Sequence, residues 1–301
     1  MKHSCIFLFL FSLMLVSCSS DDEQEQNSDG RKLRQLTIDE VPITRATLTD
    51  NTSALGAAWK TGDQATYFNV TSFETYNNID YGTLTASASA STSAFTGTVR
   101  CTTGDNVALF YPVQDIPTQT KEDENKVRGQ YTINLAGQDG TLATIAEKFH
   151  YVYGVAAVTS VTDNTAKATI DNMQSLLAVC KFSFTDGTND IPVKTLAINY
   201  YENSISYNMG YPLSATLKPT ADVSTLALTY PKQGQSAWNK DGLSVTLGTE
   251  TSDGVYVALF PYSPTGYMQF TVTGSSGTYT GTAKATLNAG KYYPVTLKLT
   301  K

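Results

Sequence analysis

The amino-acid sequence predicts an all-β protein made of two tandem β-sandwich domains, and three observations support this prediction. Thr, Ser and Val are abundant and are joined by 18 Tyr and 12 Phe, a composition that suits half-buried pleated surfaces. Short segments with alternating apolar residues recur at intervals of roughly 8–12 residues with turn residues between them, as in sandwiches and barrels. The chain has 301 residues, enough for two cores, because domains usually contain roughly 100–200 residues.

The N-terminus is predicted to be a secretory signal peptide covering residues 1–17. Lys2 precedes the apolar run 6–16, which is shorter than the ~18 residues that a membrane-spanning helix needs. The run ends in Leu-Val-Ser-Cys at Cys18, and this ending resembles the lipobox of bacterial lipoproteins, in which the cysteine thiol carries diacylglycerol. We expect cleavage before Cys18 and a lipid anchor on it, since each buried CH₂ group contributes ~0.8 kcal/mol. The alternative is an ordinary signal peptide followed by a chance cysteine.

Residues 18–35 are expected to form the lipidated N-terminus and a flexible spacer. Residues 19–31 contain no apolar side chain, so this part of the chain should be solvated. Asp21, Asp22 and Glu23 follow the cysteine closely. This acidic cluster resembles the surface-export signal of Bacteroidetes lipoproteins, and its other interpretation is a plain polar linker.

The first strand of the body is expected at residues 36–45. Leu36 and Ile38 alternate with polar residues, as in a half-buried strand, and Pro42 predicts an edge position because proline has no N–H to donate. Arg45 stands between two apolar stretches, where a trypsin-like protease would cut an exposed segment between Arg45 and Ala46. A lone arginine in a strand is also typical of a surface residue whose stem covers apolar neighbours.

The rest of the chain is predicted to divide into an N-terminal domain of residues 36–161 and a C-terminal domain of residues 162–301. Further strands are expected at 64–70, 95–100, 107–111, 130–135, 151–155, 166–170, 176–184, 194–200, 226–230, 243–247, 255–261, 268–273, 278–285 and 292–299. A loop is expected at 72–84, a charged loop at 118–128 and one helical turn at 141–147. The sequence Val-Ala-Leu-Phe at residue 107 recurs at residue 257, which favours two related sandwiches, although two apolar strands can also match by chance.

Charge and motif content exclude most other classes of function. The net charge of -6 and the pI of about 5.0 leave no basic surface for nucleic acid. Of the two histidines, His3 lies in the signal, so any triad or metal cluster would have to use His150 alone. The sequence contains no Cys-x-x-Cys pair, phosphate-binding glycine loop, nucleotide fingerprint or calcium loop. We therefore expect no enzyme activity, cofactor or metal, and a structural, hydrogen-bonded His150.

Two cysteines remain in the body, Cys101 and Cys180. An oxidising compartment allows a disulfide between them. Cys180 lies inside an apolar, strand-like stretch, where a cysteine usually packs as a small hydrophobic residue. The sequence leaves both interpretations open.

Several short segments occur in a fixed order along nearly the whole chain. They are the lipobox at Cys18, residues 43–46, Trp59 with Gly62 and Asp63, and residues 95–97, 107–112, 151–154, 173–184, 257–262 and 287–293. This order resembles the fimbrillin family of Bacteroidetes, which comprises type V pilins and their accessory subunits. The resemblance implies a surface lipoprotein with two transthyretin-like β-sandwich domains that a protease trims at an arginine.

Applied to this chain, the resemblance implies a cut between Arg45 and Ala46. Loss of the first strand would open an apolar groove, which a C-terminal strand of another subunit would fill by β-strand addition. The strand-like stretch from Tyr292 to Leu299 is followed by little further chain. Either that stretch is itself the donor strand, or the subunit is a tip, an anchor or a stand-alone surface protein.

Together these inferences predict a structural or adhesive subunit of cell-surface fimbriae, assembled by protease-triggered strand exchange. Its expected partners are other fimbrial subunits, the outer membrane through the lipid anchor, and a ligand on a host or bacterial surface. We expect it on the cell surface, as an outer-membrane lipoprotein and in the fimbrium. The alternative is a surface lipoprotein that binds glycans on exposed aromatic side chains and does not polymerise.

Overall fold

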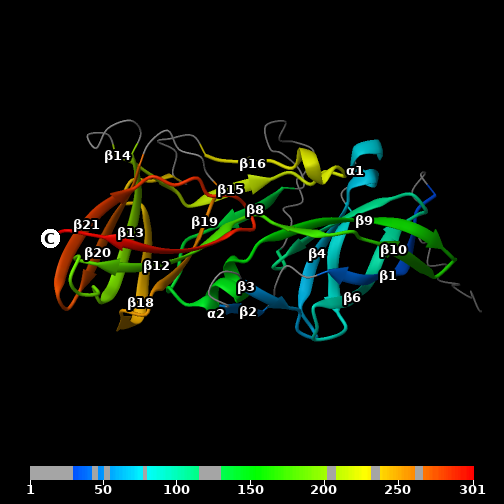
Figure 1. The fold of residues 1–301 in the computed structure, drawn as a ribbon. Helices are drawn as coiled ribbons and strands as arrows, with labels where there is room; N and C mark the ends of the chain where they lie inside the picture. The colour runs from blue at the N-terminus through cyan, green and yellow to red at the C-terminus, as the bar shows by residue number, and fades with distance from the viewer. Residues whose placement is uncertain are drawn as a thin grey trace, which may run out of the picture.

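The structure is a computed structural model that describes residues 30–42, 47–50, 55–76, 80–114, 130–201, 208–231, 238–261 and 267–301. It is elongated and consists mostly of strands, with the first half of the chain at one end and the second half at the other (Figure 1). The helical segments are α1 (Val70–Tyr76), α2 (Leu142–Thr144), the π-helix η1 (Ile145–Phe149) and the 3₁₀-helix η2 (Val223–Thr225). The predicted all-β class is confirmed.

The strands are short and are numbered along the chain. The first half contains β1 (Lys32–Pro42), β2 (Thr47–Asp50), β3 (Leu55–Ala58), β4 (Gln64–Asn69), β5 (Tyr81–Ala86), β6 (Thr92–Cys101), β7 (Asn106–Tyr111), β8 (Tyr131–Asn134), β9 (Val152–Val161), β10 (Thr165–Thr169) and β11 (Met173–Ser175). The second half contains β12 (Ala178–Thr185), β13 (Val193–Tyr201), β14 (Asn208–Pro212), β15 (Ser214–Leu217), β16 (Leu228–Thr229), β17 (Trp238–Asn239), β18 (Leu243–Thr251), β19 (Val255–Leu259), β20 (Tyr267–Gly274), β21 (Gly277–Ala283) and β22 (Tyr292–Lys298).

The first half forms a sheet that closes on itself. Its strand order is β10-β1-β6-β5-β4-β7-β9-β11, and β10 also pairs with β9. Because β10 is bonded both to β1 and to β9, the strands return to their starting point and make a barrel-like ring. One face of these strands forms a separate buried cluster that includes Leu36, Ile38, Trp59, Phe95 and Val107. This cluster is the interior of the ring.

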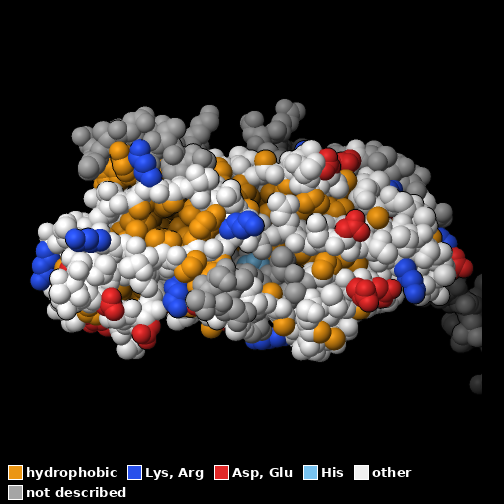
Figure 2. All heavy atoms as spheres, viewed as in Figure 1, with side chains coloured by type: hydrophobic (Ala, Val, Ile, Leu, Met, Phe, Trp, Pro, Cys, Tyr) orange, Lys and Arg blue, Asp and Glu red, His pale blue; other side chains and the backbone are white. Residues whose placement is uncertain are grey.

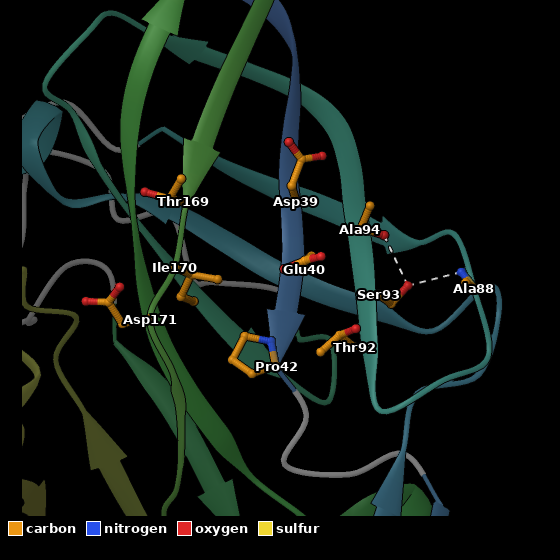
Figure 3. A pocket seen from close by; sticks show the side chains of 10 residues that line it. All are labelled: Asp39, Glu40, Pro42, Ala88, Thr92, Ser93, Ala94, Thr169, Ile170 and Asp171. Carbon is orange, nitrogen blue, oxygen red and sulfur yellow. Dashed lines mark hydrogen bonds between the residues drawn. The ribbon is translucent and has the colours of Figure 1, made fainter.

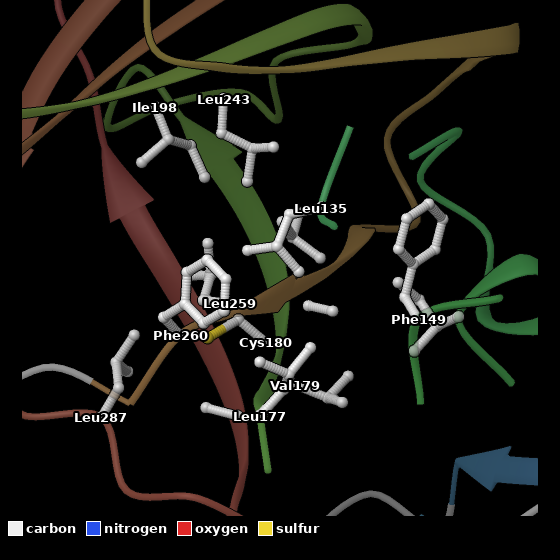
Figure 4. Close-up of a cluster of buried hydrophobic side chains, with 14 of the residues drawn as sticks. Leu135, Phe149, Leu177, Val179, Cys180, Ile198, Leu243, Leu259, Phe260 and Leu287 are labelled. Atoms are coloured by element: carbon white, nitrogen blue, oxygen red, sulfur yellow. The ribbon is translucent and has the colours of Figure 1, made fainter. Parts of the chain in front are cut away.

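The second half packs two sheets against each other. One sheet has the order β19-β12-β22, and the other has the order β17-β14-β13-β20-β21, with β18 also paired to β13. Phe182 and Phe184 of β12 point at Phe270 of β20, with ring centroids 5.1 and 6.3 Å apart. Side chains from both sheets and from the first half meet in the apolar core of this sandwich (Figure 4).

The two halves are joined by strand pairing and by buried hydrogen bonds. Strand β8 pairs with β15 across the junction. Gln138 is only 3% exposed; its amide group donates to the carbonyl of Ala258 at 3.0 Å and accepts from the N–H of the same residue at 2.7 Å. Apolar side chains of β4 and β7, such as Phe68 and Phe110, belong to the same core as those of the second sandwich. The halves therefore share one apolar interior.

Some predicted boundaries need correction. Strands β10 and β11 lie beyond residue 161, where the second domain was expected to begin, yet they pair with β1 and β9 of the first sheet. The loop predicted at 72–84 contains most of α1 and the start of β5, and the strand predicted at 226–230 is reduced to the short β16. Pairing between strands far apart in the sequence, rather than local sequence, set the bounds of these elements. The charged loop predicted at 118–128 lies outside the described residues.

Strand β1 also differs from its prediction. It begins at Lys32 rather than at Leu36, so residues 32–35 belong to the strand and not to the spacer. Pro42 does not mark an edge strand, because β1 is paired on both sides and Pro42 is its last residue. A proline at the end of a strand costs little pairing, since the missing N–H lies where the ladder stops.

A glycine in β6 tests the packing of the barrel. A Cβ on Gly97 would lie 2.6 Å from the carbonyl oxygen of Thr83 and 2.7 Å from a methyl group of Leu84. We expect Gly97→Ala to lower the free energy of unfolding by about 1–3 kcal/mol, because a crowded core must shift to accept the extra methyl group. Urea denaturation measures this change.

Gly248→Ala is the matched control, because nothing lies within 4 Å of a Cβ at that position. It should leave stability unchanged or raise it by up to about 1 kcal/mol. Equal effects of the two substitutions would contradict the close packing around Gly97.

Candidate functional site

The candidate site is strand β1 together with the slot that holds it in the barrel. On one side β1 runs antiparallel to β6, from the pair Lys32 and Cys101 to the pair Pro42 and Thr92. On the other side it runs parallel to β10, with Ile38 opposite Ala168. Removal of β1 would leave two strand edges without a neighbour, and such edges are templates for pairing with another chain.

Apolar side chains of β1 fill the floor of the slot. Leu36, Ile38 and Val41 have no exposed surface, and burial of each such side chain contributes about 1.5–3 kcal/mol. The indole N–H of Trp59 donates to the carbonyl oxygen of Val41 at 3.2 Å. The Trp59 ring packs edge-on against Phe95, with centroids 4.8 Å apart. Without β1, the slot would be an open apolar groove.

Charged side chains fix the start of β1. Arg31 donates from Nε and Nη2 to the two carboxylate oxygens of Asp105, at 2.8 and 2.6 Å. Both side chains are nearly inaccessible, at 4% and 2% exposure. Arg34, which is 7% exposed, donates to the carbonyls of Thr162 at 2.7 Å and of Cys101. These two arginines connect β1 to three different parts of the barrel.

A second carboxyl group lies near this anchor. The pKa of Asp80 is raised to about 6, mainly by burial and to a smaller extent by the negative charge of Asp105. The positive charge of Arg100 and a hydrogen bond from the Tyr67 hydroxyl act in the opposite direction. Asp80 is therefore a charged group whose burial opposes folding at neutral pH.

The far end of β1 borders an open groove. Glu40 has a positive φ of 52°, and the pairing register with β6 shifts between Ile38 and Val41. The groove has a volume of about 840 Å³, and the carboxylates of Asp39, Glu40 and Asp171 stand around it (Figure 3). The end of β1 is thus irregular and accessible from the side.

The predicted processing residues lie outside the described part of the chain. This applies to Cys18 and to both Arg45 and Ala46. The described chain stops at Pro42 and resumes at β2, which pairs with β3. The Asp50 carboxylate accepts from the Lys181 ammonium at 3.0 Å and from the Tyr256 hydroxyl at 2.6 Å. The predicted cut therefore falls between two anchored elements, β1 in the barrel and β2 on the second half.

Three other sequence-based expectations can be compared with the structure. His150 is 2% exposed and its Nε2 lies 3.0 Å from the Ser175 hydroxyl, in agreement with a structural role. Cys101 and Cys180 are free and buried, so they do not pair. Burial raises the pKa of the Cys101 thiol to about 11 and that of Cys180 to about 12, which keeps both protonated at neutral pH.

Within the described ranges, no three His, Cys, Asp or Glu residues come together as a set of metal ligands. The same ranges contain no helix with the length and apolar character needed to cross a membrane.

Sequence reasoning missed the charged anchor of β1. The sequence placed Arg31 in the predicted spacer and assigned no role to Asp105. The two residues are 74 positions apart, and no local pattern connects them. The available signal was a pair of arginines, Arg31 and Arg34, directly ahead of an alternating apolar strand.

Comparisons with known proteins agree with this fold. No protein-family model and no curated protein matches the sequence. Two crystal structures, each of a "putative cell adhesion protein", match nearly the full length of both chains. The protein from Bacteroides uniformis ATCC 8492 has a TM-score of 0.51 at 16% identity and covers 90% of this chain and 93% of its own. The protein from Bacteroides ovatus ATCC 8483 has a TM-score of 0.53 at 13% identity, covering 88% and 92%.

A fimbrial protein from Bacteroides ovatus ATCC 8483 matches more weakly, with a TM-score of 0.39, 14% identity and coverage of 89% and 49%. The fold is established by the first two structures. The fimbrillin-like resemblance predicted from the sequence is therefore confirmed as a similarity of fold.

Asp80 gives a prediction about pH. Because its pKa is about 6 in the folded protein and 3.8 in the reference state, the folded state binds this proton more tightly. Its contribution to stability is complete below pH ~4 and is lost as the pH rises through ~6. We expect Asp80→Asn to raise the free energy of unfolding at pH 7.5 by about 1–3 kcal/mol, and to flatten the decline between pH 4 and 6.

Urea denaturation across this pH range measures both effects. Asp163→Asn is the control, since the Asp163 side chain is 93% exposed and its replacement should change stability by less than about 0.5 kcal/mol. A loss of stability in Asp80→Asn at pH 7.5 would mean that the attraction of Arg100 outweighs the cost of burial.

Proposed function

We propose that this protein is a non-enzymatic structural or adhesive subunit of cell-surface fimbriae, assembled by strand exchange. The observation that carries the proposal is the position of β1. It is the first described strand, it is paired on both sides, and it covers an apolar floor. One cut between Pro42 and Thr47 would separate β1 from the chain that follows it, and a strand from another subunit could then occupy its slot.

The fold neighbours support the same class of function. Two of them are named as cell adhesion proteins of Bacteroides species. In this proposal Cys18 carries the lipid that attaches the precursor to the outer membrane, and export places it on the cell surface. The cut between Arg45 and Ala46 releases β1 from the body.

The last strand has the properties of a donor. Within the described ranges, strand β22 pairs along its length with β12 alone and lies at the edge of its sheet. Its inward-facing Val295 and Leu297 are only half-buried, and an apolar band crosses this part of the second half (Figure 2). Release of β22 would therefore cost less burial than release of β1. This strand is our candidate for the segment that enters another subunit.

The outer edge of β22 is protected against pairing with strands of other molecules. The N–H of Leu299 points toward β12, whereas Thr300 exchanges hydrogen bonds with Thr280 on the opposite side. Successive residues of a strand direct their backbone groups to alternate edges, so Pro294 shares the outer edge with Thr300. Proline removes a donor from the middle of that edge, which is a common protection against pairing between edges.

Glycan binding is not favoured by the exposed surface. Among the described residues, the strongly exposed large hydrophobic side chains are Leu33 and Val113. Neither is aromatic, and stacking on sugars requires an accessible ring. The tyrosine rings of the described surface, such as those of Tyr267 and Tyr293, are only partly exposed, which offers less area for stacking than the alternative needs.

The proposal is tested with lipid-free protein in which Cys18 is replaced by alanine. Treatment with an arginine-specific protease should produce a chain that begins at Ala46, followed on prolonged incubation by a ladder of oligomers. The ladder should form slowly, because β1 stays bound through its paired edges and buried side chains until a donor displaces it. Mass spectrometry and gel electrophoresis without boiling measure the two steps.

Arg45→Gln should abolish both the cut and the ladder. Arg128→Gln, which removes an arginine at another site, is the matched control and should leave both intact. A cut chain that remains monomeric and binds a polysaccharide would contradict strand exchange and support the glycan-binding alternative.

A further inference from the structure

The ion pair between Arg31 and Asp105 joins the exchangeable strand to the barrel that remains, because Arg31 directly precedes β1 and Asp105 directly precedes β7. Arg31 leaves with β1, whereas Asp105 lies just ahead of β7 and stays. In the described part of the chain, Arg31 is the sole donor to Oδ1 of Asp105. The Asp105 side chain is 2% exposed while β1 is in place. The departure of β1 would remove the donor to Oδ1, and a replacement strand without a cation would bury this carboxylate again with that oxygen unsatisfied.

The barrel holds this carboxylate in place after β1 has gone. Its Oδ2 accepts from the side-chain amide of Asn69 at 2.9 Å and from the backbone N–H of Thr102 at 3.0 Å. Asn69 is itself fully buried in β4. These two donors keep Asp105 oriented toward the slot, so it does not turn away into solvent when its cation departs.

The charged groups around Asp105 make a positive charge beside it more favourable. Asp80 is a second buried acid whose pKa is raised in part by the charge of Asp105. Arg34, the other cation at this end of the slot, also leaves with β1. Arg100 remains and acts on Asp80. A buried charge that loses its partner is strongly unfavourable, so the slot without β1 favours an incoming group of positive charge.

We propose that Asp105 selects the strand that replaces β1, by requiring a cationic side chain at the position that Arg31 occupies. This inference rests on the proposed strand exchange and adds the chemistry of the partner. The partner is an extended segment with apolar residues at the places of Leu36 and Ile38, and with a guanidinium one residue ahead of the position paired with Cys101. Strand β22 of a second copy has Gly290 at that position when its Val295 and Leu297 take the places of Leu36 and Ile38, so the slot selects a strand of a different subunit over β22 of this chain. Arginine fits better than lysine, because Asp105 receives two parallel hydrogen bonds from Nε and Nη2.

The test uses the full chain after a single cut within residues 43–46, with β1 still bound. Labelled peptides of residues 30–42 compete with the resident strand, and the fraction of label bound at equilibrium gives their relative affinities. The peptides are the wild-type sequence, Arg31→Met, Arg31→Lys and the control Lys32→Met. Lys32 is a suitable control because its side chain is 46% exposed and its ion pair with the exposed Asp163 is long, at 3.7 Å.

The Arg31→Met peptide should bind at least about 100-fold more weakly than the wild-type peptide, because it buries the Asp105 charge without a partner. The Arg31→Lys peptide should lose about tenfold, and Lys32→Met should stay within about threefold of the wild type. The same competition on an Asp105→Asn protein should reduce the Arg31→Met effect to less than about tenfold.

Two other outcomes separate the inference from the proposed function. If the wild-type and Arg31→Met peptides bind equally well, strand exchange stands but Asp105 does not select the strand. If even the wild-type peptide fails to replace the resident strand under conditions that loosen β1, strand exchange fails and the selection fails with it.

Discussion

The two-sided pairing of β1 is the interaction on which the barrel depends. This strand joins β6 to β10, and with it the ring of strands is closed. Its apolar side chains are buried in the barrel interior. Arg31 donates to the buried carboxylate of Asp105, and Arg34 donates to the backbone carbonyls of Thr162 and Cys101. A strand with so many contacts is normally a permanent part of a fold. Here it precedes a segment with a predicted cut, so a strand that is held on both sides is also the one that proteolysis could set free.

This arrangement combines stability with a delayed release. The covalent connection after Pro42 can be broken without disturbing the pairing of β1, because the pairs with β6 and β10 are independent of it. In the proposed mechanism, the cut would leave the structure unchanged at first and would allow a competing strand to displace β1 stepwise from its free end. Strand β22 lies at an edge and is half-buried, so its release would cost less burial than the release of β1. This difference would make β22 the donor and the slot of β1 the acceptor.

The shared interior of the two halves explains why domain boundaries are poorly visible in the sequence. Strand β8 pairs with β15, and Gln138 bonds both ways to Ala258. Phe110, on the outer face of the barrel, stacks on Tyr131 of β8 and belongs to the same buried cluster as the core of the second half. The sequence pattern locates strands and turns, but it does not show which hydrophobic core each strand joins. This is why β10 and β11 were placed in the wrong half.

The all-β class, most strand positions and the alternation that buries Leu36 and Ile38 could be predicted from the sequence, because these depend on local composition and period. The structural role of His150 was predicted in the same way. That β1 closes a ring, that Pro42 ends an internal strand and that Arg31 meets Asp105 in the interior became visible in the folded chain alone. Those outcomes depend on contacts between residues far apart in the chain, and the free energy of a buried charge pair exists only once the barrel has excluded water around it.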